Sequence, residues 1–86
     1  MERYKIRIKR SAGKELRKIH GKDQARIVQR IRGLASDPRP PGAKKLSGEE
    51  RYRVRQGAYR VLYEVSDVAV TVFVVRIAHR GEAYQK

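Results

Sequence analysis

The chain has 86 residues, a formal net charge of +13 and no cysteine. A chain of this length builds one modest core, which predicts a single domain over residues 1–86, and the lack of cysteine excludes disulfides, thiolate nucleophiles and thiolate metal sites. The two histidines are too far apart for a metal motif, and no apolar run approaches the roughly 20 residues that span a bilayer, so we expect a cytoplasmic protein without a metal, a cofactor or a membrane contact.

The first third of the chain predicts a strand followed by a helix. Apolar and basic residues alternate over residues 4–9, which is typical of a strand with one wet face. Leu16 and Ile19 then form the apolar edge of a short helix, which Ser11 would cap and which ends before Gly21.

A second helix is predicted from Asp23, as its N-cap, to the Asp37-Pro38 pair. Its apolar positions recur at helical spacing and are Ala25, Ile27, Val28, Ile31, Leu34 and Ala35. Its outer face carries three arginines, Arg26, Arg30 and Arg32. The proline disfavours helical geometry in the residue before it, so the helix ends there.

The remaining residues predict a loop and three strands. Residues 39–48 form the loop, and residues 51–55 and 59–65 alternate around a turn at Gln56-Gly57-Ala58. The almost wholly apolar run over residues 70–77 is typical of a central strand covered on both faces. The order of elements predicts an α+β fold, in which a two-helix hairpin packs on one face of a four-stranded, mainly antiparallel sheet.

Alternation places three guanidinium groups on one face of the first hairpin strand, those of Arg51, Arg53 and Arg55. Tyr52 then points into the core. Because like charges repel and each needs solvent or an anion, such a row predicts contact with a polyanion, which the net charge would also attract. Lys44 and Lys45, just before this strand, would either contact RNA backbone or form a solvated basic loop.

Two segments resemble the RelE family of bacterial and archaeal toxins, within the wider RelE/ParE superfamily. One is Tyr52-Arg53-Val54-Arg55 with Gly57 and Tyr59-Arg60-Val61-Leu62-Tyr63-Glu64-Val65, and the other is the ending from Val74 through His79-Arg80-Gly81-Glu82-Ala83-Tyr84. The resemblance covers essentially the whole chain. It implies the toxin of a type II toxin–antitoxin pair, namely a ribosome-dependent endoribonuclease that cleaves mRNA in the ribosomal A site without metal, by attack of the RNA 2′-hydroxyl on the adjacent phosphate.

The resemblance also implies partners and alternatives. The partners are the ribosome and mRNA, an acidic RelB-like antitoxin that blocks the basic face, and operator DNA only indirectly through that antitoxin. ParE-like relatives share the fold but poison DNA gyrase, without nuclease chemistry. A passive basic nucleic-acid-binding module is a third interpretation of the charge.

Three residues match family positions with assigned roles. Arg60 matches an arginine that contacts the scissile phosphate, although an ion pair with Glu64 is the structural alternative. Arg80 matches the C-terminal arginine assigned to the transition state or the leaving group, and a solvated tail charge is its alternative. Tyr84 matches a tyrosine that stacks on or orients the reacting nucleotide, and it would otherwise pack against the helix.

The general base is where this sequence departs from the family pattern. Arg53 and Arg55 stand where the best-known pattern carries lysines, one of them proposed as the base, and an arginine keeps its proton at ordinary pH. We therefore expect phosphate clamps at these positions. His79 becomes the candidate for proton transfer, because an imidazole titrates near neutral pH, unless it points away and only caps the strand end.

Overall fold

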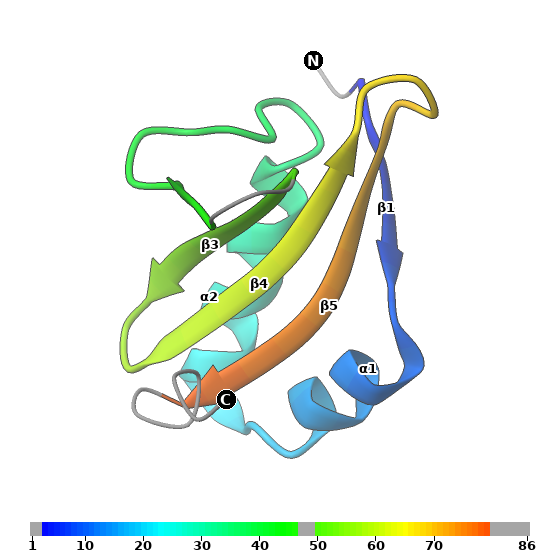
Figure 1. Cartoon of the computed structure of the whole chain (residues 1–86). Helices are drawn as coiled ribbons and strands as arrows, with labels where there is room; N and C mark the ends of the chain where they lie inside the picture. Colours follow the sequence, from blue (N-terminus) through cyan, green and yellow to red (C-terminus); the bar gives the residue numbers. More distant parts are fainter. Residues whose placement is uncertain (1–2, 47–49, 80–86) are drawn as a thin grey trace.

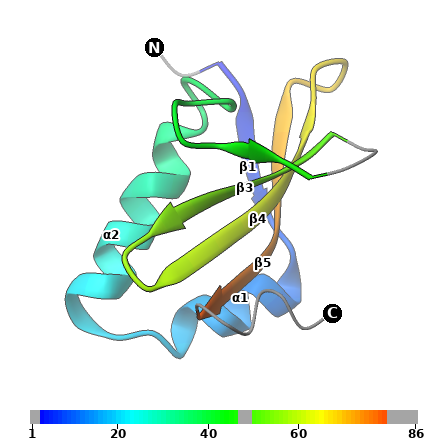
Figure 2. The same ribbon diagram turned by 60° about the vertical axis from the view of Figure 1, so that its left-hand side comes forward.

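The computed structural model describes residues 3–46 and 50–79 (Figure 1). The elements are β1 (Lys5–Ile8), α1 (Arg10–Arg17), α2 (Gly21–Gly33), β2 (Lys44–Lys45), β3 (Arg51–Gln56), β4 (Tyr59–Ser66) and β5 (Thr71–His79). The strands form one sheet in the order β1-β5-β4-β3-β2, in which β1 and β5 are parallel and all other neighbours are antiparallel. Figures 1 and 2 show α2 lying across one face of this sheet. We call the opposite face the outer face.

The predicted α+β fold is confirmed, but within residues 3–46 and 50–79 the sheet has five strands and not four. The additional strand is β2, which lies in the predicted loop and pairs Lys44 with Arg53 and Lys45 with Tyr52. Two residues flanked by prolines and glycines are too few to show an alternating pattern. The pairing is decided by the edge of β3, which offers unpaired backbone groups to the returning chain.

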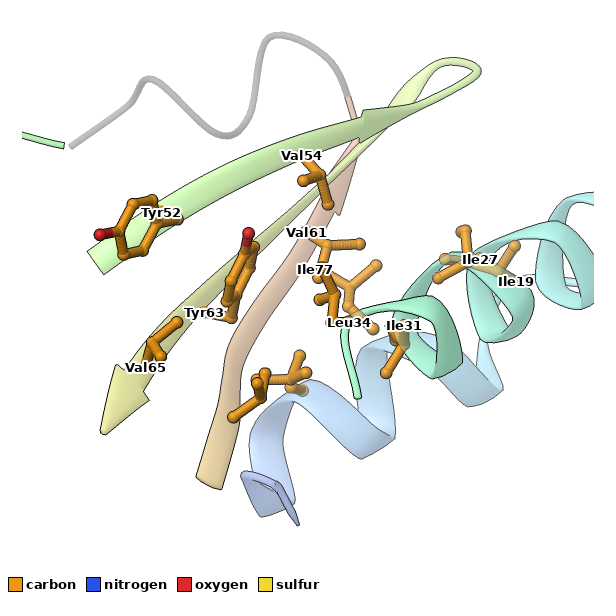
Figure 3. Packing of buried hydrophobic residues seen from close by; sticks show 13 residues of the cluster. Ile19, Ile27, Ile31, Leu34, Tyr52, Val54, Val61, Tyr63, Val65 and Ile77 are labelled. Carbon is orange, nitrogen blue, oxygen red and sulfur yellow. The ribbon is translucent and has the colours of Figure 1, made fainter. Parts of the chain in front are cut away.

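The core lies between α2 and the inner face of the sheet (Figure 3). Ile27, Ile31 and Leu34 are buried, as their spacing predicted. Ala25 was predicted on the same stripe, but it is exposed. At about 100° per residue, a position two before Ile27 lies on the far side of the helix. The buried apolar residues that the sheet contributes to this core are Tyr52, Val54, Val61, Tyr63, Val65, Val72, Val74 and Ile77.

Neither helix has the predicted side-chain cap. The N-cap positions are Lys9 for α1 and His20 for α2, and neither side chain makes a capping hydrogen bond. Ser11 and Asp23 both lie inside the first turn, where the charge of Asp23 is favourable at the positive end of the helix dipole. Gly21, the first residue of α2, follows the short connection between the helices and has a φ of 66°, a conformation that other residues rarely adopt.

The second helix also differs from its prediction at its other end and on its outer face. It ends at Gly33, several residues before Pro38. Arg26 and Arg32 are exposed, but Arg30 is half-buried and reaches toward the following loop, where a Cβ at Gly42 would lie 3.7 Å from its Nη2 atom. The loop therefore packs back over this side of the helix.

Strand β5 is central in the sheet, but only one of its faces is buried. Val72 and Val74 face α2, whereas Phe73 is 42% exposed on the outer face. The prediction of a strand covered on both faces is therefore wrong.

The apolar run arises from a bulge. Tyr63 pairs with Val74, but the preceding Leu62 pairs with Arg76, so Val75 is an extra residue on β5. One extra residue reverses the alternation along the strand. Val72 and Val74 face inward before the bulge, and Ile77, an odd-numbered position, faces inward after it.

Helix α1 completes the edge of β5 beyond the end of β1. The register of β1 with β5 stops at the pair of Ile8 and Val74. Further along, the backbone N–H of Ile77 donates to Glu15 Oε1 at 2.8 Å, and Arg76 Nε lies 3.5 Å from Glu15 Oε2. A carboxylate from α1 thus satisfies a strand-edge donor and fixes the end of β5 that carries His79.

Candidate nucleic-acid interface

The strand register arranges basic side chains of the outer face in rows across the sheet. One row contains Lys44, Arg53, Leu62 and Arg76, and the next contains Arg55, Arg60 and Ala78. The predicted alternation of β3 is confirmed, because Tyr52 and Val54 are buried while the arginines on either side of them are half-buried or exposed. Rows of cations at neighbouring positions suit a phosphate backbone.

The opposite end of the outer face is closer to neutral. Arg51 Nε donates to Glu64 Oε2 at 3.1 Å, and the two residues are a directly opposed pair in the register of β3 and β4. The carboxylate that the sequence offered as a partner for Arg60 is therefore engaged by Arg51. Of the three predicted RNA-binding arginines on β3, Arg53 and Arg55 lie nearest the strongly basic end.

Arg60 differs from its neighbours in being buried. It is 4% exposed, and Ala78, its partner on β5, is 3% exposed. Arg55, its partner on β3, is exposed. Burial holds the guanidinium of Arg60 in one position, and contact with a phosphate requires a rearrangement that exposes it. Alternation predicted the face of this residue, but not its burial.

His79 lies at the same end of the sheet. Its imidazole makes an edge-to-face contact with Tyr59, with ring centroids 5.3 Å apart and an interplanar angle of 87°. The two residues are paired in the register, and Tyr59 shares its strand face with Val61 and Tyr63. His79 is therefore on the face opposite Arg60, one position along the ladder. Arg80 and Tyr84 lie outside the described residues.

The two lysines of β2 point in different directions. Lys44 is paired with Arg53 and extends its row on the outer face. Lys45 is paired with the buried Tyr52, and its Nζ atom lies 3.3 Å from Glu50 Oε2. Lys44 is thus placed to meet an anion together with Arg53, whereas Lys45 is held by a carboxylate.

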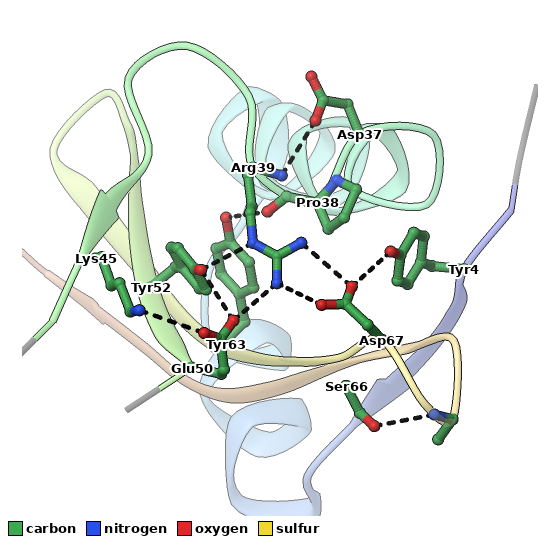
Figure 4. Close-up of polar contacts among 11 residues, drawn as sticks. Tyr4, Asp37, Pro38, Arg39, Lys45, Glu50, Tyr52, Tyr63, Ser66 and Asp67 are labelled. Atoms are coloured by element: carbon green, nitrogen blue, oxygen red, sulfur yellow. Dashed lines mark hydrogen bonds and ion pairs between the residues drawn. The ribbon is translucent and has the colours of Figure 1, made fainter. Parts of the chain in front are cut away.

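Arg39, which the sequence did not single out, is the centre of a polar network (Figure 4). Its guanidinium donates to Tyr52 Oη at 2.8 Å, to Glu50 Oε1 at 2.7 Å and to Asp67 Oδ2 at 3.0 Å. Tyr4 also donates to Asp67, at 2.7 Å. These contacts join the α2–β2 loop to β3 and to the β4–β5 turn, and through Asp67 to Tyr4, the residue before β1. No local sequence motif predicts these contacts, because the partners are far apart in sequence.

This network lowers the pKa of two carboxyl groups. Hydrogen bonds from Arg39 and then Tyr4 hold the pKa of Asp67 below its usual value. Hydrogen bonds, first from Arg39, do the same for Glu50. A depressed pKa in the folded state means that the ionised carboxylate stabilises the fold above the unfolded pKa near 4, and that this stability is lost as the pH falls through the folded value.

We therefore predict that replacing Arg39 with glutamine flattens the acid limb of the stability curve. The melting temperature of the parent protein should fall more steeply than that of the Arg39→Gln variant as the pH is lowered from 6 to about 3. Thermal unfolding followed by circular dichroism measures both curves, and Arg32→Gln, at an exposed helix position, is the matched control. Parallel curves for the parent protein and Arg39→Gln would show that this network does not govern the acid transition.

Within residues 3–46 and 50–79, no group of three or more histidine and acidic side chains is placed to hold a metal ion. Neither α1 nor α2 has the length and apolar character needed to span a bilayer.

Two sequence comparisons identify the family. A profile of the ParE toxin of the type II toxin–antitoxin system parDE matches residues 6–84. The chain is also 30% identical, over 87 residues, to Toxin RelG of Mycobacterium tuberculosis strain H37Rv, and the alignment covers 96% of this chain and 98% of RelG. The chain belongs to the RelE/ParE superfamily of type II toxins.

Solved structures agree with the fold of this toxin. It is similar to a chain in the RelBE2 toxin–antitoxin complex of Mycobacterium tuberculosis, with a TM-score of 0.80, 31% identity and coverage of 93% of this chain and 94% of the other. It is also similar to the isolated E. coli RelE toxin, with a TM-score of 0.80, 26% identity and coverage of 94% and 90%. The resemblance inferred from the sequence is confirmed.

Proposed function

We propose that this toxin is a ribosome-dependent endoribonuclease, which cleaves mRNA in the ribosomal A site and so inhibits translation. The observation that supports this most is the pair of basic rows on the outer face, in which Arg53, Arg55 and Arg60 lie in adjacent register positions on β3 and β4. The row of Arg55 and Arg60 ends at Ala78, the residue before His79, while the imidazole of His79 lies on the other face of the sheet. A nuclease needs both cations and a group that transfers protons, so the end of β5 must rearrange on RNA binding for His79 to reach the substrate.

The chemistry divides into three tasks that the chain's own residues can perform. The RNA 2′-hydroxyl loses a proton and attacks the adjacent phosphorus, the phosphate gains negative charge, and the 5′-oxygen leaves with a proton, giving a 2′,3′-cyclic phosphate and a 5′-hydroxyl. Arg60 neutralises the phosphate, and His79 transfers a proton. Arg80 stabilises the transition state or the leaving group, and Tyr84 stacks on the nucleotide to hold it in line.

The basic residues around Arg60 bind the phosphates of the RNA that flank the scissile one. Arg53, Arg55 and Lys44 bind neighbouring phosphates. Arg51 and Lys45 are engaged by Glu64 and Glu50, and they contribute to RNA binding only when those carboxylates release them. No step requires a metal ion, since guanidinium groups take over the neutralisation of the phosphate.

The proposal includes an antitoxin. One structural relative was solved in the RelBE2 toxin–antitoxin complex of Mycobacterium tuberculosis, and another in the RelB-RelE antitoxin–toxin complex of Methanococcus jannaschii. A net charge of +13 favours an acidic, RelB-like protein as the partner of this toxin. Such a protein would cover the basic rows in the cytoplasm, and operator DNA would be reached only through it.

A reconstituted translation reaction tests this function. Purified toxin is added to ribosomes translating a defined mRNA, and the mRNA ends are mapped by primer extension, with ribosome-free mRNA in a parallel reaction. We expect cuts at A-site codons only when ribosomes are present. Intact mRNA in both reactions would reject the proposal.

Poisoning of DNA gyrase is the second candidate, because the matching family profile is that of ParE toxins. A supercoiling assay with purified gyrase distinguishes the two functions. Inhibited supercoiling together with intact mRNA would assign the toxin to the gyrase class, whereas mRNA cleavage with unaffected gyrase would assign it to the nuclease class.

Arg53→Ala is expected to weaken RNA binding and to reduce its salt dependence. Each lost phosphate contact lowers the slope of log K against log salt by about 0.7 for a single strand. Fluorescence anisotropy with a labelled RNA oligomer at several salt concentrations measures this slope. Arg32→Ala, on the exposed side of α2, is the matched control and should leave it unchanged. An unchanged slope for Arg53→Ala would argue against phosphate contact at this position.

A further inference from the structure

Phe73 is a large aromatic side chain presented on the outer face of a central strand. It is 42% exposed, although its neighbours Val72 and Val74 are fully buried on the other face. In the register it lies between Arg7 of β1 and Glu64 of β4. An aromatic ring flanked by a guanidinium and a carboxylate is unlike the rest of the outer face, where cations predominate.

The ring of Phe73 lines a hollow of about 410 Å³. Its polar lining comes from Arg7, Glu50, Glu64, Ser66 and Thr71. Within this lining, Glu64 uses Oε2 for Arg51, and Ser66 Oγ accepts a hydrogen bond from the N–H of Ala69 at 3.0 Å. The second oxygen of Glu64 and the hydroxyl hydrogen of Ser66 are thus suited to an acceptor and a donor role toward a ligand.

We propose that this hollow is a subsite for one unpaired nucleobase, which stacks on Phe73 beside Arg7. An aromatic ring supplies the face on which any base stacks, and an arginine plane supplies a second one. Glu64 and Ser66 meet the polar edge of the base. The inference rests on the proposed function only in taking RNA as the ligand.

The position of the hollow relative to the basic rows supports this ligand. Phe73 and Glu64 share a register row with Arg51, and the next row on the same face contains Lys44 and Arg53. Same-face positions along a strand are about 7 Å apart. The same row continues through Leu62 to Arg76 on the strand of Phe73, so a strand of RNA whose phosphates lie along Arg53 and Arg76 has a base within reach of Phe73. The high positive charge of this chain favours a polyanion over an apolar protein segment at this face.

Binding of a non-cleavable oligonucleotide tests the subsite without requiring catalysis. The probes are two fluorescein-labelled 2′-O-methyl RNA hexamers, one complete and one with a central abasic position. We expect Phe73→Ala and Phe73→Leu each to weaken binding of the complete hexamer by about 5- to 100-fold. The slope of affinity against salt should not change, because no phosphate contact is lost.

A second variant reports on stacking directly. The chain contains no tryptophan, so Phe73→Trp introduces a single indole whose fluorescence should be quenched by the complete hexamer and should not be quenched at the abasic position. Ile8→Ala is the matched control, since Ile8 is 41% exposed on the opposite face of β1, and it should leave binding unchanged. Thermal unfolding confirms that each variant is folded.

The possible results separate this inference from the proposed function. Equal affinities for the complete and abasic hexamers, or parent-like affinity in Phe73→Leu, would overturn the subsite, and the second result would show that RNA binding does not need the aromatic ring. A base-dependent loss in both variants would support the subsite even if the toxin cut no mRNA in the translation assay.

Discussion

Replacing Arg60 with alanine is expected to lower the rate of mRNA cleavage by about 100- to 1000-fold. Removing one donor that stabilises a developing oxyanion typically has this effect. Arg60 is 4% exposed, and its register partners are Arg55 and Ala78, so a local rearrangement must expose its guanidinium before it meets the phosphate. The measurement is the single-turnover rate of cleavage in the reconstituted translation reaction.

Two companion variants make the result interpretable. Arg55→Ala removes the exposed cation directly across from Arg60 and should reduce cleavage by less than about tenfold, because it weakens binding and not the reaction itself. Arg60→Lys keeps the charge but loses the bidentate geometry, so we expect a rate between those of the parent toxin and Arg60→Ala. Cleavage by folded Arg60→Ala at the parent rate would remove Arg60 from the mechanism.

Replacing Tyr63 with alanine is expected to cost about 3–5 kcal/mol of unfolding free energy, a large part of the stability of a domain of this size. Tyr63 is fully buried, stacks on Tyr52 with ring centroids 5.8 Å apart, and donates a hydrogen bond from Oη to the carbonyl oxygen of Pro38 at 2.7 Å. Its burial raises its pKa to about 12. Alanine would remove the ring from the core and leave that carbonyl group without its donor.

The loss of stability is measured by urea and thermal unfolding. A cost of 3–5 kcal/mol corresponds to a fall in melting temperature of about 15–30 °C for a domain of this size. Tyr63→Phe keeps the ring and should cost only about 1–2 kcal/mol, which is the share of the hydrogen bond. If phenylalanine cost as much as alanine, the contact with Pro38 would be the dominant contribution, and the packing of the ring would be minor.

The predictions that the structure confirmed were those that rested on a strong local pattern. The alternation from Arg51 to Val65 predicted the correct face for every buried apolar residue of the first hairpin, because a strand that packs on one face must alternate. The helical stripe of Ile27, Ile31 and Leu34 held for the corresponding reason.

The elements that failed were those decided by distant partners. Strand β2 exists because the edge of β3 offers it hydrogen bonds, and its two residues show no pattern of their own. Strand β5 was predicted to be covered on both faces because its apolar run does not alternate. The run arises because the bulge at Val75 changes which positions point inward. A one-residue irregularity of this kind is set by the pairing with β4 and cannot be read from β5 alone.

The sequence by itself determined the family, the fold class and the basic character of one sheet face, since these follow from charge, periodicity and ordered motifs. Only the tertiary structure decided that Arg60 is buried, that Glu64 is engaged by Arg51, and that His79 packs against Tyr59 on the other face. It also brought Arg39 to Asp67, across 28 positions of sequence. The physical reason is that burial and ion pairing depend on which strands meet and in which register, and local sequence encodes that only in part.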